Sequence, residues 1–173
     1  MSRTSKEPPF ALVDAERACK AAQRLFATVR ELLAARLPPT AEVRHIGATA
    51  IPGCLTKGDL DIVVRIPAED FAEADAALAS LFTRNEGSIR TGTFSAFEDA
   101  TNDPHLGVQL AAIDGPFDTF HLFVEALRRS PQLVEDYNAL KRRHDGLDMD
   151  VYRAAKDAFV EQVLADLANA EAR

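Results

Sequence analysis

Two aspartates placed one residue apart are the side chains in this sequence best suited to chemistry. Asp59 and Asp61 lead into a largely apolar run, residues 62–66, which ends at Pro67. Because successive side chains of a strand point to opposite faces, both carboxylates are expected on the same face. Two adjacent carboxylates repel each other, and Mg²⁺ commonly binds one or two such groups together with phosphate oxygens and water. The spacing therefore predicts that Asp59 and Asp61 are metal-binding, catalytic residues.

A loop containing glycine and proline precedes this acidic pair. Gly47 has no Cβ, so its turn can bring backbone N–H groups close to a phosphate. Ala48 and Thr49 complete the turn, and Lys57 adds a positive charge near the carboxylates. An anion-binding turn, a metal-binding acidic pair and a lysine are the parts required for metal-assisted phosphoryl or nucleotidyl transfer.

Further candidates for ligand binding lie outside this loop. His45 precedes the glycine turn and could orient the loop or contact a substrate, although a histidine at a strand end is more often structural. Tyr137 and Lys141 are four residues apart, as are Tyr152 and Lys156, so each pair shares one face of a helix. Each pair could line a pocket, and the alternative for each is an ordinary helix surface.

The elements that must position these residues follow from the hydrophobic periodicity. Apolar residues at intervals of three and four predict helices at residues 15–33, 68–82, 117–129, 131–144 and 150–170. Short β-branched or apolar runs predict strands at residues 43–46, 62–66, 91–97 and 107–113. This order predicts an α/β (α+β-like) fold with a helical C-terminal part, about residues 117–173.

Length and composition limit the domain organisation and the partners. The 173 residues carry a formal net charge of −7, and we expect residues 1–10 to form a flexible N-terminal tail before one domain, residues 11–173. The acidic balance argues against an extended nucleic-acid or membrane surface. Cys19 and Cys54 form no CxxC motif. With no apolar stretch near the ~18 residues of a membrane span and no signal-peptide pattern, we expect a cytoplasmic protein.

The loop and the acidic pair together resemble the signature of the polymerase-β-like nucleotidyltransferase superfamily, in which a glycine turn precedes a D-x-D strand. More narrowly, the sequence HIGATAIPG at residues 45–53, followed by Lys57 and by DIVV at residues 61–64, resembles the GrpB family. The sequences YNALK at residues 137–141 and YRAAK at residues 152–156 agree with that family as well. The resemblance covers roughly residues 41–165.

The resemblance implies a nucleotidyltransferase-like fold, a small mixed sheet flanked by helices. It also implies binding of a nucleoside triphosphate with Mg²⁺ and transfer of a nucleotidyl group to a small acceptor. The phosphates would then contact His45, Gly47, Ala48, Thr49, Lys57, Lys141, Tyr152 and Lys156.

Two positions depart from the expected pattern. Ala48 replaces the family's serine, and Gln109 stands on the strand where the superfamily has a third carboxylate. Glu98 or Asp114, near strand ends, could substitute for that carboxylate. Two alternatives therefore stay open, a non-catalytic nucleotide- or anion-binding module and a protein-interaction module that docks through its helical third.

Overall fold

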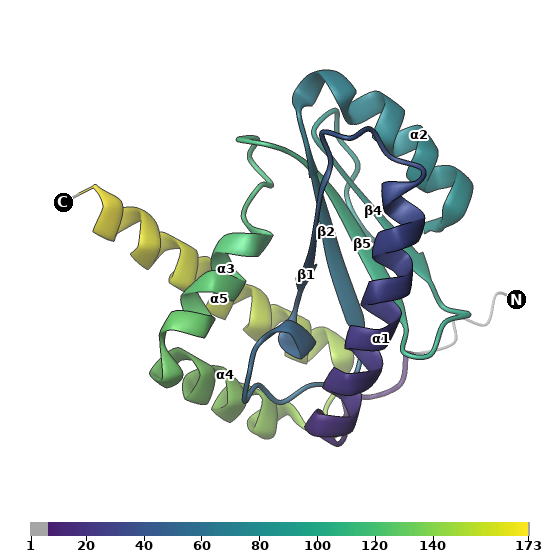
Figure 1. Cartoon of the computed structure of the whole chain (residues 1–173). Coiled ribbons are helices and arrows are strands. Elements are labelled where there is room, and N and C mark those ends of the chain that lie inside the picture. Colours follow the sequence, from purple (N-terminus) through teal and green to yellow (C-terminus); the bar gives the residue numbers. More distant parts are fainter. Residues whose placement is uncertain (1–6, 173) are drawn as a thin grey trace, which may run out of the picture.

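The computed structural model describes residues 7–172, which form a five-stranded mixed sheet with helices packed on both faces (Figure 1). The strands are β1 (Glu42–Ile46), β2 (Leu60–Ile66), β3 (Thr83–Arg84), β4 (Phe94–Asp99) and β5 (Leu106–Ala112). The helices are α1 (Ala15–Ala34), α2 (Phe71–Leu81), α3 (Phe120–Arg129), α4 (Pro131–His144) and α5 (Met149–Glu171). Two 3₁₀ turns, η1 (Ala48–Ala50) and η2 (Ala68–Asp70), complete the order.

The sheet places the acidic strand at its centre. The strand order is β1-β2-β5-β4-β3, with β2 and β5 parallel and the other neighbouring pairs antiparallel. In this register Asp61 lies beside Gly107 of β5, and Gly107 lies beside Glu98 of β4. Residues that are far apart in the sequence therefore meet at one end of the sheet.

The alternation of side chains along β2 divides the protein into two cores. Ile62 and Val64 pack in a core with α1 and α2, whereas Val63 packs with α3, α4 and α5. Asp61 has the same parity as Val63, so it also faces the C-terminal helices. Figure 1 shows α1 and α2 on one side of the sheet and α3, α4 and α5 on the other.

The elements expected from periodicity are present, and the predicted α/β class with a helical C-terminal third is confirmed. Asp14 caps α1, because its carboxylate accepts a hydrogen bond from the Arg17 amide at 2.8 Å. β3 was not among the predicted strands, because it is only two residues long and too short to show alternation. No helix within residues 7–172 has the length and apolarity to cross a membrane.

The N-terminal segment differs from the expected flexible tail. Residues 1–6 lie outside the described part of the chain, but Phe10 is fully buried and stacks on Tyr152 with the ring centroids 3.7 Å apart. Glu7 forms an ion pair with Arg153 at 2.6 Å. The apolar ring of Phe10 fills a gap between α4 and α5. Together with the Glu7 ion pair, this contact makes the chain from Glu7 onward part of the folded domain.

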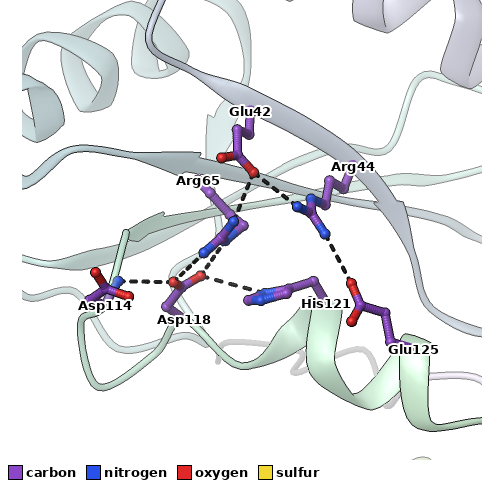
Figure 2. A network of polar contacts seen from close by, with 7 residues as sticks. All are labelled: Glu42, Arg44, Arg65, Asp114, Asp118, His121 and Glu125. Atoms are coloured by element: carbon purple, nitrogen blue, oxygen red, sulfur yellow. Dashed lines mark hydrogen bonds and ion pairs between the residues drawn. The ribbon is translucent and has the colours of Figure 1, made fainter.

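A network of charged side chains fastens the far end of β2 to the loop before α3 (Figure 2). Arg65 donates two hydrogen bonds to Asp118, at 2.6 and 2.7 Å, and one to Glu42 at 2.7 Å. Asp118 also accepts a hydrogen bond from the backbone amide of Asp114 at 2.9 Å. Planar, bidentate pairs of this kind fix the relative position of two elements.

Asp118→Asn is expected to destabilise the fold by about 3 kcal/mol at neutral pH, because it removes the buried counter-ion of the mostly buried Arg65 guanidinium and leaves only the more exposed Glu42. Burial raises the pKa of Asp118, but the Arg65 hydrogen bonds outweigh it, so the pKa lies below its ordinary value. A lowered carboxyl pKa gives stability that is present above about pH 4 and is lost as the pH falls. The free energies of unfolding of wild type and Asp118→Asn, measured by urea denaturation, should therefore converge in acid. Asp114→Asn, which keeps the backbone donor, should behave as wild type.

Candidate functional site

A cavity of about 250 Å³ lies between the sheet and the C-terminal helices. Its polar end is lined by residues from the loop, the strands and α5, namely Gly47, Ala48, Lys57, Asp59, Asp61, Gln109 and Lys156. The opposite wall is apolar and comes from α3 and α5, with Phe120, Phe123, Val124, Val160 and Leu164. The chain thus encloses one space in which a charged group and an apolar group can be bound side by side.

The carboxylate of Asp61 sits between two glycines. A Cβ on Gly47 would lie 2.7 Å from Asp61 Oδ2, and a Cβ on Gly107 would lie 2.8 Å from Asp61 Oδ1. Both distances are shorter than any side chain tolerates, so the carboxylate occupies the space that these two residues leave free. Gly47 also has φ 74° and ψ −176°, a region that is essentially restricted to glycine.

The charge on Asp61 is poorly compensated by its neighbours. Burial raises the pKa of Asp61, and the negative charge of Asp59 raises it further, while the positive charge of Lys156 lowers it in part. Within residues 7–172 the Asp61 carboxylate has no hydrogen bond or ion pair, whereas Asp59 has the Lys57 ammonium at 2.5 Å. A desolvated carboxylate that faces a cavity without a partner is suited to bind a cation or a donor group of a ligand.

These residues fit the requirements of Mg²⁺. Two carboxylates on one face are the protein ligands that this ion commonly takes, with water and phosphate oxygens completing its shell. No group of three or more His, Cys, Asp or Glu side chains in the described part of the chain is arranged to hold a metal by itself. Asp59 and Asp61 would therefore share the ion with a ligand that brings its own oxygens.

His45 and Thr49 hold the loop in place and do not line this cavity. The Thr49 hydroxyl donates to the backbone carbonyl of Asp59 at 3.1 Å, so its oxygen is free to accept from His45 Nε2 at 2.9 Å. Burial, and then the positive charge of Arg128, lower the pKa of His45 to about 4. The imidazole is thus neutral at pH 7, and it positions Asp59 through Thr49.

Lys141 and Lys156, both expected to contact phosphates, both line the cavity but have different surroundings. Lys141 is 1% exposed, and its ammonium donates to the Leu55 carbonyl at 2.5 Å and to Cys54 Sγ at 3.2 Å. Burial lowers the pKa of Lys141 to about 8. Lys156 lines the cavity and has no ion pair within residues 7–172, so its charge is available to a ligand. Tyr152 also lines the cavity, with its ring stacked on Phe10.

Glu98 and Asp114, the two residues that could substitute for the third carboxylate, lie at opposite ends of the sheet. Glu98 lies at the same end of the sheet as the acidic pair, with its Oε2 3.3 Å from His105 Nε2, and His105 Nδ1 is 4.0 Å from Asp59 Oδ2. Asp114 follows β5 at the opposite end, in the network of Figure 2. Gln109 lines the cavity on the strand expected to carry the third acid.

The apolar wall of the cavity and the contact of His105 with the acidic pair were not predicted from the sequence. Residues of α3 and α5 that line the cavity show the same helical spacing as buried core residues, so their periodicity predicts burial and not a pocket. His105 belongs to no motif. Only the parallel pairing of β2 and β5, in which the Leu60 amide donates to the His105 carbonyl, brings His105 to the acidic pair.

Comparison with known proteins identifies the family. The model of the family described as GrpB protein matches residues 13–166. The chain belongs to the GrpB family. A UPF0157 protein of Vibrio cholerae serotype O1 is 36% identical over 135 residues, which cover 78% of this chain and 71% of the relative.

Two solved structures resemble the fold of this GrpB chain. GrpB from Enterococcus faecalis has a TM-score of 0.63 at 18% identity, covering 88% of this chain and 96% of that protein. The Cid1 poly(U) polymerase bound to MgATP has a TM-score of 0.52 at 14% identity, covering 75% of this chain and 42% of the polymerase. The fold is therefore nucleotidyltransferase-like, as the resemblance in the sequence implied.

Proposed function

We propose that this GrpB protein binds a nucleoside triphosphate together with Mg²⁺ and transfers the nucleotidyl group to a small acceptor. The observation that carries the proposal is the Asp61 carboxylate, which faces the cavity without a partner in the described chain while Asp59 lies on the same face. The fold it shares with Cid1, which was solved with MgATP, supports a nucleotide as the ligand.

Each part of the cavity has a role in this proposal. Asp59 and Asp61 would hold Mg²⁺, which supplies positive charge against the triphosphate oxygens. The turn at Gly47 and Ala48 would place backbone amides beside the phosphates, and Lys57, now paired with Asp59, would share its charge with them. An acceptor hydroxyl oxygen would bond to the α-phosphorus and lose its proton to water, while the bond from the α-phosphorus to the departing pyrophosphate would break. Lys156 would stabilise the charge on that leaving group.

The size and charge of the protein support a small acceptor. The cavity of about 250 Å³ has an apolar wall opposite the acidic pair, and the net charge of −7 disfavours a long polyanion. We place the reaction in the cytoplasm, where the free thiols Cys19 and Cys54 stay reduced.

Gln109 favours a second candidate function. An amide at the position of the third carboxylate cannot act as a carboxylate base, so the same cavity could bind a nucleotide without turning it over. Binding that is nearly independent of metal, through the Gly47 turn and the lysines, would distinguish this module from the enzyme.

The proposal is tested by capturing the ligand and following its chemistry. Purified protein would be incubated with Mg²⁺ and a metabolite extract, and co-purifying molecules would be identified by mass spectrometry. We expect a nucleotide, and with α-labelled triphosphate we expect label transfer to an extract component together with pyrophosphate release. Capture of a nucleotide without any transfer would favour the binding module, and capture of none would contradict both functions.

Lys156→Met is expected to weaken triphosphate binding about tenfold with little change in melting temperature. The reason is that removing one full charge at close range from a phosphate costs on the order of 1 kcal/mol near a surface. Calorimetric titration would measure the affinity. Lys20→Met is the matched control, because Lys20 is an exposed lysine on α1 that pairs with Glu16, away from the cavity. Equal affinities of the two variants would remove Lys156 from the site.

A further inference from the structure

A second cavity, of about 290 Å³, lies along the outer edge of β1 between α1 and α3. Three arginines line it, Arg30 from α1, Arg44 from β1 and Arg128 from α3. Two histidines, His45 and His121, line it as well. None of the roles assigned to the nucleotide cavity uses these arginines.

The charge of this second cavity is positive although the protein as a whole is acidic. Its lining carries three arginines against one carboxylate, Glu125, in a chain of net charge −7. Arg128 donates to a neutral group, the Ala50 carbonyl, at 2.7 and 3.1 Å, so its charge stays uncompensated. Arg30 is exposed and has no ion pair within residues 7–172. Only Arg44 is neutralised, by Glu42 and Glu125 at 3.1 Å each.

His121 adds an unsatisfied polar atom at the same place. Its Nδ1 is buried and has no hydrogen-bond partner within the described residues, since the nearest carboxylate oxygen, on Asp118, is 3.6 Å away. Figure 2 shows the ring lying between Asp118 and Glu125. With two uncompensated guanidinium groups against one carboxylate, the cavity provides donors in excess of acceptors.

We propose that this second cavity is a binding site for a phosphate-bearing anion, distinct from the nucleotide cavity. Guanidinium groups match the geometry of phosphate oxygens and are more weakly hydrated than ammonium groups, so a cluster of them selects this class of ligand. The anion would contact Arg30 and Arg128 directly and approach His121.

The second cavity is connected to the acidic pair by short contacts. Arg128 holds the carbonyl of Ala50 in η1, and His45 reaches the Asp59 carbonyl through Thr49. An anion bound in this cavity would therefore act on Arg128 and His45, the two residues that fix the loop between Gly47 and Asp59. Binding in the second cavity is expected to stabilise that loop.

The test is a calorimetric titration of pyrophosphate in the presence of a chelator, which removes any metal-dependent binding at the acidic pair. We expect Arg30→Gln to weaken pyrophosphate binding about five- to tenfold, since one close charge is removed. Arg24→Gln, which removes the same charge from a position on α1 outside the cavity, should leave the affinity unchanged. Lys156→Met should also leave it unchanged, because Lys156 lines the other cavity.

Proton NMR of the histidine rings locates the anion independently. Pyrophosphate should shift the His121 signals and leave those of His144, on α4, in place. The proposal is overturned if wild type does not bind pyrophosphate, if Arg30→Gln binds it as wild type does, or if Lys156→Met alone abolishes binding. The last result would assign the anion to the nucleotide cavity. None of these outcomes depends on nucleotidyl transfer, so this inference can fail while the proposed function holds.

Discussion

Asp61→Asn is expected to abolish Mg²⁺-dependent triphosphate binding and turnover, and at the same time to stabilise the unliganded protein. Asparagine keeps the shape of the side chain but removes the charge that holds a strongly hydrated cation. Without ligand, the carboxylate is desolvated beside Asp59 and has no partner in the described chain, so its removal should raise the free energy of unfolding by about 1 kcal/mol. Thermal unfolding and triphosphate affinity would be measured on the same samples.

The pH dependence provides a separate check of this result. Because the pKa of Asp61 is raised in the folded protein, the contribution of Asp61 to stability is highest in acid and falls as the pH rises from the ordinary value of 3.8 through the raised pKa. Asp61→Asn should lack this fall. Asp157→Asn is the matched control, since Asp157 also lines the cavity but is exposed on α5. If Asp157→Asn were more stable than wild type and Asp61→Asn were not, the proposed repulsion within the acidic pair would be refuted.

Gly47→Ala is expected to destabilise the fold by about 3 kcal/mol and to displace Asp61. Two costs combine, a backbone conformation reserved for glycine and a Cβ placed 2.7 Å from the Asp61 carboxylate. Gly53→Ala separates the two costs. Gly53 also has a positive φ, of 76°, but a Cβ added there would have no atom within 4 Å. We expect that control to lose only about 1 kcal/mol.

A double variant isolates the contact between the turn and the acidic pair. In an Asp61→Ala background the added methyl group of Gly47→Ala no longer meets a carboxylate, so part of the destabilisation should be recovered. Denaturant midpoints of the single and double variants would give the coupling energy. If Gly47→Ala and Gly53→Ala were equally stable, the close approach of Gly47 to Asp61 would not exist in solution.

The parts of the site that the sequence predicted are those that depend on local spacing. Asp59 and Asp61 lie on one face because a strand alternates, and this follows from two residues and the apolar run after them. The apolar run also predicted the strand β2, and Pro131, a residue that commonly begins a helix, predicted the start of α4. The turn at Gly47 could be expected near the pair because only a short loop separates them.

What the sequence could not predict depends on contacts between distant elements. Gly107 leaves room for the Asp61 carboxylate only through the parallel pairing of β2 and β5, which no local pattern encodes. Lys141 lines the cavity, but the hydrogen bond from its ammonium to the Leu55 carbonyl, which forms because the loop folds over α4, follows from no local pattern. Phe10 was assigned to a tail and is fully buried, since one aromatic residue beside two prolines gives no periodicity.

The most direct test of the central claim is calorimetry of nucleoside triphosphates with the wild-type protein, once with Mg²⁺ and once with a chelator. If Asp59 and Asp61 hold the metal against the phosphates, binding should be tight with Mg²⁺ and at least tenfold weaker without it, because the bare triphosphate meets two like charges. Equal affinity in both buffers, or tighter binding in the chelator, would contradict a metal-bridged triphosphate at the acidic pair.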